Sequence, residues 1–128
     1  MATVHLDSRQ AKHAQDIRAG SHQLVADEPP ANGGQDAGPD PYQLVLAGLA
    51  ACTSITLRMY ADRKGWELGP VHVDLWFHRD GDEERIERTI VLAPGVTDEQ
   101  RARLAEIAEK TPVTKTIKRG TPIVTKLA

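Results

Sequence analysis

The chain has a single cysteine and few aromatic side chains. The first scarcity limits the cellular compartment, and the second limits which side chains can form the core. One cysteine cannot form an intramolecular disulfide, which favours a reducing, cytoplasmic compartment. Aromatic residues make up only 4% of the sequence, so smaller aliphatic side chains must fill the core. A net charge of -2 gives no electrostatic case for binding nucleic acid or an anionic membrane. No charged-then-apolar signal segment opens the chain.

Length and hydrophobic patterning favour one soluble domain over residues 1–128. The mainly apolar run over residues 44–57 is shorter than the ~20 apolar residues that a membrane-spanning helix needs. We therefore expect a core helix. Asp40 is a good N-cap and Pro41 suits the first helical position, so the helix should begin there. It should end near Lys64, before Gly65.

This helix is apolar nearly all the way round, so it needs cover on every side. A domain of this size with few large residues would cover it poorly alone. A strip of small residues, which includes Ala47 and Gly48, also permits close approach of another backbone. We expect a second copy of the chain to supply part of the cover.

The remaining elements are shorter. Residues 1–26 predict two or three strands with a hairpin turn at 19–21. Residues 27–39 are a Pro- and Gly-rich loop, and its Gly33-Gly34 pair is interpreted as a flexible turn, because the Lys-Ser/Thr of a phosphate loop is missing. A strand over 71–78 and its return over 85–92 should form a hairpin. The order of elements predicts an α+β fold.

The C-terminal third predicts a helix and a strand. Thr97 and Gln100 form a capping box ahead of an amphipathic helix, which Pro112 should end. The helix should bury Leu104, Ile107 and Ala108 and carry the ion pairs Glu99–Arg103 and Glu106–Lys110. A last strand is expected over 121–127.

Cys52 is the leading chemical candidate, with an inert buried thiol as the alternative. A nucleophilic thiolate needs a helix N-terminus or nearby cations, and the predicted helix begins about three turns before Cys52. Help would then come from a basic side chain, and the candidates are Arg18, Arg58, Lys115, Lys118 and Arg119. His72 and Asp74 share a strand face, but His78 lies roughly 20 Å farther along the strand. We expect no metal and no cofactor.

Residues 38–61, which read GPDPYQLVLAGLAACTSITLRMYA, closely resemble the central helix of the OsmC/Ohr family. Residues 20–29, the Gly33-Gly34 loop, residues 63–66, the strand pair and residues 104–113 resemble its OsmC-like branch. The similarity covers nearly all of the chain after the first ten or so residues.

That resemblance implies an intertwined α+β homodimer and thiol peroxidase chemistry. In such a family a peroxidatic thiolate attacks an organic hydroperoxide and becomes a sulfenic acid, and a second cysteine resolves it. Cys52 matches the peroxidatic position. Arg18 lies in the region of the activating arginine.

The chain departs from the family pattern at the partners of this cysteine. The family's Cys-Pro-Val-His segment reads Thr111-Pro-Val-Thr114 here, so the resolving cysteine is replaced. The carboxylate expected early in the helix is also missing, since Tyr42 and Gln43 stand there. We expect these four side chains to line the substrate pocket.

Three hypotheses follow. The first is that the protein is a one-cysteine peroxidase for organic hydroperoxides in oxidative-stress defence, with an external thiol as reductant. The second is that it is a catalytically impaired family member that binds a small apolar or thiol ligand in the dimer pocket. The third is that it has a structural or interaction role and that Cys52 is inert.

Overall fold

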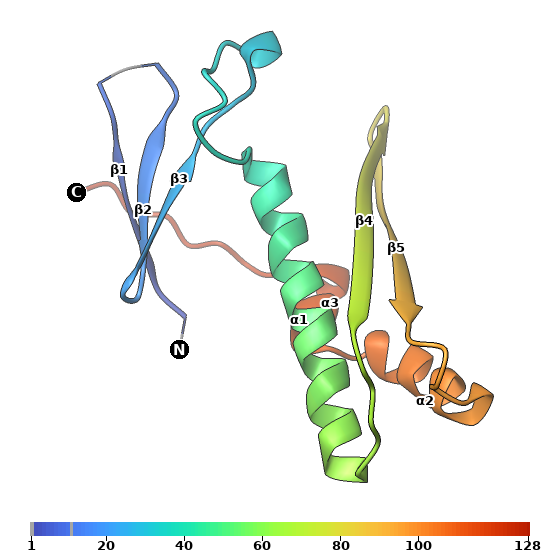
Figure 1. The fold of residues 1–128 in the computed structure, drawn as a ribbon. Helices are drawn as coiled ribbons and strands as arrows, with labels where there is room; N and C mark the ends of the chain where they lie inside the picture. Colours follow the sequence, from blue (N-terminus) through green and yellow to red (C-terminus); the bar gives the residue numbers. More distant parts are fainter. Residues whose placement is uncertain (1, 11) are drawn as a thin grey trace. The chain divides into compact units, whose positions relative to one another are not determined.

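The computed structural model describes residues 2–10 and 12–128 and has the predicted α+β fold (Figure 1). The elements in chain order are β1 (Val4–Ser8), β2 (Gln15–Ala19), β3 (His22–Ala26), a 3-10 turn η1 (Pro30–Asn32), α1 (Pro41–Lys64), β4 (Val71–Asp80), β5 (Glu83–Leu92), α2 (Asp98–Ala108) and α3 (Pro112–Arg119). The chain divides into two compact units, Met1–Val45 and Leu46–Ala128. That they form one domain stays a prediction.

The first unit is built on an antiparallel sheet with the strand order β1-β2-β3. The predicted hairpin is confirmed, because Ala19 pairs with His22 across a two-residue turn that begins at Gly20. Ile17 and Ala26 are buried in this unit. The sheet is small, and most of the remaining strand residues are exposed or only partly buried.

The loop after β3 is more ordered than the flexible turn that the sequence predicts. The buried carboxylate of Asp27 accepts hydrogen bonds from the backbone N–H groups of Glu28, Gln35 and Ala37 at 2.8–3.1 Å. The bond from Ala37, followed by that from Glu28, holds the pKa of Asp27 below its ordinary value. A Cβ at Gly34 would overlap the backbone carbonyl of Glu28, so the tight turn needs glycine there.

Both ends of α1 lie where the sequence predicts them. Asp40 and Gln43 form a capping box, in which each side chain accepts a hydrogen bond from the backbone N–H of the other, at 2.8 and 2.9 Å. The helix ends at Lys64 because Gly65 adopts a left-handed conformation with φ 71°. The helix continues through Gly48 without interruption.

One face of α1 is buried and the opposite face is open. The buried residues recur every fourth position: Leu49, Thr53, Leu57 and Ala61. Ile55 and Met59 on the opposite face are 58% and 57% exposed, although both are apolar. By length and composition alone α1 could cross a membrane, since its most apolar window has a mean hydropathy of 1.5 and is only 22% buried. The sequence prediction judged residues 44–57 too short to span a membrane, but the whole helix passes this test of length and composition.

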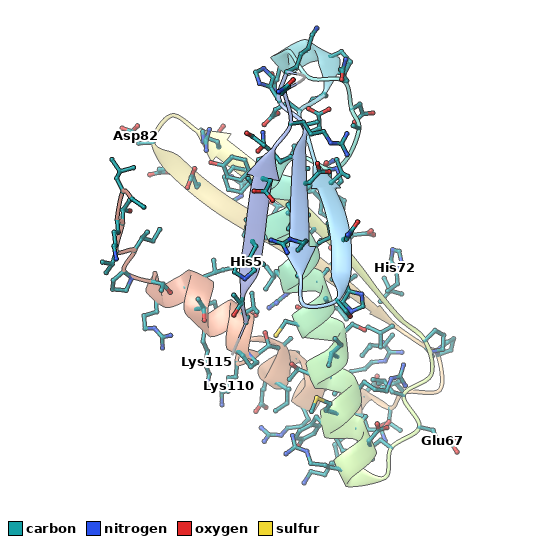
Figure 2. The ribbon with its side chains drawn as sticks, turned by 90° about the vertical axis from the view of Figure 1, so that its left-hand side faces the viewer. His5, Glu67, His72, Asp82, Lys110 and Lys115 are labelled. Atoms are coloured by element: carbon teal, nitrogen blue, oxygen red, sulfur yellow. The ribbon has the colours of Figure 1, made fainter. Side chains whose placement is uncertain are left out.

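The second unit places a two-stranded sheet and two short helices against α1. β4 and β5 pair antiparallel, and Figure 2 shows Asp82 at the tip of their hairpin. The hydrophobic core consists of Leu57, Ala61, Leu68, Val96, Leu104 and Ala108. The capping box of Thr97 and Gln100 is confirmed. Arg103 pairs with Glu106 at 2.8 Å, three residues on, rather than with Glu99 as predicted.

Two predictions for the C-terminal region were wrong. Pro112 does not simply end the preceding helix, because α2 already ends at Ala108 and Pro112 is the first residue of α3. Residues 121–128 form no strand. Ile123, Val124 and Leu127 in this tail are 89–96% exposed, so no strand of the described chain pairs with it.

Candidate functional site

The only thiol of the protein, that of Cys52, lies half-buried on α1. The backbone N–H of Val113 donates to its Sγ at 3.5 Å, and the Thr56 hydroxyl lies 3.8 Å from the same sulfur. Val113 belongs to the first turn of α3. The thiol therefore lies against the N-terminus of a second helix.

The first turn of α3 leaves one amide for this sulfur. The Thr111 side chain caps the helix and accepts from the N–H of Thr114 at 3.3 Å, and the Thr111 carbonyl accepts from Lys115. Pro112 has no N–H. The N–H of Val113 is the remaining orphan donor, and it points at Cys52. A helix N-terminus carries partial positive charge, so it can stabilise negative charge that develops on the sulfur.

The sequence contained a signal for this arrangement that the helix assignment missed. The prediction considered only the N-terminus of α1, which is too far from Cys52 to help. However, Thr111-Pro112 repeats the pattern of Asp40-Pro41, an N-cap followed by proline at the first helical position. Reading Pro112 only as a terminator hid the helix that approaches the thiol.

Two of the predicted pocket residues, Thr111 and Thr114, form a buried hydroxyl pair behind the α3 N-terminus. Their Oγ1 atoms are 2.6 Å apart, and Thr114 is also within 3.4 Å of the Ala108 carbonyl. Thr111 is completely buried. The position that would hold the family's second cysteine is thus close along the chain to the amide that contacts Cys52.

Arg88 on β5 is the functional candidate that the sequence reasoning did not name. Its Nη1 donates to the hydroxyls of both Thr53 and Thr114 at 3.0 Å, and its Nη2 donates to the Ala108 carbonyl at 2.9 Å. Only 13% of its side chain is exposed. Alternation along β5 places Arg88 on the same face as Ile86 and Ile90, and a charge on that apolar face was the available signal.

The other sequence-predicted cations and pocket residues belong to several elements of both units, and Lys115, Lys118 and Arg119 are on α3. Arg18 is exposed on β2 in the first unit, opposite Gln23. Tyr42 and Gln43 are in the first turn of α1, where the Gln43 side chain serves the capping box. Arg58 donates to the backbone carbonyl of Gly69. Within the second unit, Thr111 and Thr114 flank the first turn of α3, whose Val113 amide contacts Cys52.

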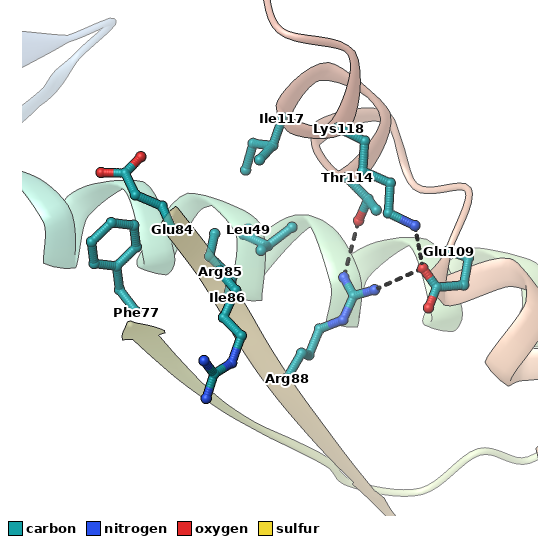
Figure 3. Close-up of a pocket in the computed structure, with 10 residues that line it drawn as sticks. All are labelled: Leu49, Phe77, Glu84, Arg85, Ile86, Arg88, Glu109, Thr114, Ile117 and Lys118. Atoms are coloured by element: carbon teal, nitrogen blue, oxygen red, sulfur yellow. Dashed lines mark hydrogen bonds and ion pairs between the residues drawn. The ribbon is translucent and has the colours of Figure 1, made fainter. Parts of the chain in front are cut away.

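A cavity of about 570 Å³ lies within the second unit beside Arg88 (Figure 3). Its lining residues are Leu49, Phe77, Glu84, Arg85, Ile86, Arg88, Glu109, Thr114, Ile117 and Lys118. Four of these side chains are apolar, five are charged and one is a threonine, so the lining is mixed. A hydrogen bond from Lys118 at 2.6 Å, supported by the charge of Arg88, holds the pKa of Glu109 below its ordinary value. Cys52 is not among the lining residues.

No group of three or more potential metal-ligating side chains occurs within residues 2–10 and 12–128. His72 instead pairs with Asp74 at 3.1 Å on the exposed strand face. His78 lies 3.4 Å from Glu87. His72 therefore belongs to the surface of the hairpin, whereas His78 is partly buried.

Comparison with known proteins places these features in a family. The family model described as OsmC-like protein matches residues 33–126, so the chain belongs to the OsmC-like family. That match includes Cys52, Arg88 and all of α3. None of the curated proteins compared with the chain matches it.

Solved structures share the fold at low sequence identity. An OsmC-like protein from Mycoplasma pneumoniae superposes with a TM-score of 0.79 and 16% identity, covering 92% of this chain and 87% of that one. The organic hydroperoxide resistance protein OhrB of Bacillus subtilis has a TM-score of 0.64 and 24% identity, covering 92% and 90%. An organic hydroperoxide resistance protein from Legionella pneumophila has a TM-score of 0.65 and 19% identity, and the match covers 92% of this chain and 89% of that one. These similarities establish the fold.

Proposed function

We propose that the protein is a one-cysteine thiol peroxidase that reduces organic hydroperoxides in oxidative-stress defence, with Cys52 as the nucleophile. The observation that carries this proposal is the contact between the Cys52 sulfur and the Val113 amide at the N-terminus of α3. A thiol in that place has a donor for the charge of its thiolate form. The names of the Bacillus subtilis and Legionella pneumophila proteins that share the fold add support.

The chemistry balances without a cofactor. The Cys52 thiolate attacks one oxygen of the O–O bond, and the sulfur becomes a sulfenic acid while the other oxygen leaves as an alcohol after taking up a proton. Thr111 stands where the family carries a resolving thiol, so an external thiol condenses with the sulfenic acid and releases water. A second external thiol then frees Cys52 as the external disulfide forms. A cytoplasmic location would supply such thiols.

A test of the function uses one equivalent of an organic hydroperoxide, such as cumene hydroperoxide, with the reduced protein. We expect loss of the single thiol and a mass gain of one oxygen, trapped by a sulfenic-acid reagent, and turnover once a dithiol is added. Cys52→Ser should show neither. A wild-type thiol that stays reduced after prolonged exposure would exclude the peroxidase and leave the ligand-binding or structural role.

Binding of a small apolar or thiol ligand is the alternative function. The cavity beside Arg88 favours it, because a volume of about 570 Å³ that is lined in part by apolar side chains is large enough for a small molecule. This function would need the cavity but not the reactivity of Cys52. Equal ligand affinity of the wild-type protein and Cys52→Ser would mark it.

We also propose that the protein is a homodimer in which a second copy covers the exposed face of α1. Ile55 and Met59 are more than half exposed, and Gly48 has open space around it, so another helix can approach closely. This cover makes α1 a core helix rather than a membrane span. Sedimentation at micromolar concentration should give the mass of two chains, and Gly48→Trp should weaken the dimer strongly through its bulk. A monomer in wild-type protein would contradict the proposal.

A further inference from the structure

The charged group of Arg88 is the least expected feature in the interior of the second unit. It lies on the inward face of β5 with 13% of its side chain exposed, between Ile86 and Ile90 on that face. Burying a guanidinium costs several kcal/mol unless hydrogen bonds and counter-charges compensate. A methionine or leucine would fill such a place without this cost, so the charge calls for an explanation beyond packing.

The hydrogen bonds of Arg88 connect the two elements that meet at the thiol. Its Nη1 donates at 3.0 Å to Thr53, the residue after Cys52 on α1. The same nitrogen donates at 3.0 Å to Thr114, the residue after Val113 on α3. One nitrogen of Arg88 therefore bonds to the residue that follows Cys52 and to the residue that follows Val113, the two residues that make the sulfur–amide contact.

Two further contacts fix the guanidinium itself. Nη2 donates to the carbonyl of Ala108, the last residue of α2, where the helix dipole is negative. Glu109 is 4.0 Å away and is also bound by Lys118. The Thr53 hydroxyl donates a hydrogen bond to the Leu49 carbonyl at 2.7 Å, so its oxygen is oriented to accept from Arg88.

We infer that Arg88 is a positioning residue for Cys52, which holds the N-terminus of α3 at hydrogen-bonding distance from the sulfur. The inference rests on the proposed role of Cys52 as nucleophile. The resemblance to the family assigns an arginine of the N-terminal region to activation, and Arg88 lies on a different strand in the C-terminal unit. Its action runs through Thr53 and Thr114 rather than through contact with a reacting atom.

The test compares Arg88→Met with Arg88→Lys in the full-length protein. Because one nitrogen serves both hydroxyls, an ammonium can replace that bridge, whereas the Nη2 bond to Ala108 is lost in either variant. We expect both variants to unfold at lower urea concentration. Only Arg88→Met should slow the reaction of Cys52, by at least about tenfold, the size expected for loss of a hydrogen-bonded support to a charged group.

Two rates are measured for each variant: sulfenic acid formation with cumene hydroperoxide and alkylation by iodoacetamide, both well below the unfolding transition. Arg101→Met is the matched control, since Arg101 is also partly buried and binds two backbone carbonyls, those of Val96 and Ala93, away from α3. It should keep wild-type rates. If Arg88→Met fails to fold, Thr114→Val, which removes one hydroxyl of the bridge, should slow both reactions instead.

The outcomes separate the inference from the function on which it rests. Wild-type rates in Arg88→Met, together with lower stability, would reduce Arg88 to a structural residue and overturn the inference. Equal slowing by Arg88→Lys and Arg88→Met would also overturn the bridge argument. A wild-type thiol that alkylates readily but ignores the hydroperoxide would refute the peroxidase, while the alkylation rates of the variants would still decide the role of Arg88.

Discussion

Thr111→Cys is expected to convert the protein from a one-cysteine into a two-cysteine thiol protein. Thr111 precedes the α3 turn whose Val113 amide contacts the Cys52 sulfur at 3.5 Å, so a thiol there would lie near the sulfenic acid. Intramolecular reaction gives effective concentrations far above those of added thiols. We expect the sulfenic acid to disappear at least about a hundredfold faster than in the wild-type protein with millimolar external thiol.

Intact mass after one equivalent of hydroperoxide measures this result. The variant should lose two hydrogens as a disulfide forms, whereas the wild-type protein gains an oxygen. Thr111→Ser, which keeps the capping hydroxyl, should behave like the wild-type protein, and the double variant with Cys52→Ser should form no intrachain disulfide. The loss of the Thr111 cap should cost about 1 kcal/mol of stability. Persistence of the sulfenic acid in Thr111→Cys would contradict the expectation that a thiol at position 111 reaches Cys52.

Leu104→Ala is expected to be the most destabilising single truncation in the second unit. Leu104 on α2 is 1% exposed and packs in the core with Leu57 and Ala61. Truncating a buried leucine to alanine removes its transfer free energy and leaves a cavity, which costs about 2–5 kcal/mol. Because Leu104 is almost completely buried, we expect a value in the upper half of that range.

Urea unfolding at one fixed protein concentration measures the change, since dimerisation would make stability depend on concentration. Leu127→Ala makes the same chemical change in the tail, where the side chain is 96% exposed. It should shift the free energy of unfolding by less than about 0.5 kcal/mol. A similar loss in both variants would mean that Leu104 does not close the core as the structure indicates.

Local signals predicted the elements with strong caps and periodicity. The bounds of α1, both hairpins and the capping box of Thr97 and Gln100 followed from residues close together in the chain. The errors arose where one local pattern is compatible with two structures. Pro112 both excludes helix before it and starts one, and residues 121–127 alternate like a strand but have no partner among the described strands.

By itself the sequence determined the α+β class, the long apolar helix and Cys52 as the only thiol, because composition, caps and periodicity are properties of the chain. It also identified the replacement of the second cysteine by Thr111. Only the tertiary structure decided what surrounds the sulfur. The Val113 amide and the Arg88 bridge come from elements tens of residues from Cys52 in the chain. Hydrogen bonds across such separations depend on packing, which no local pattern encodes.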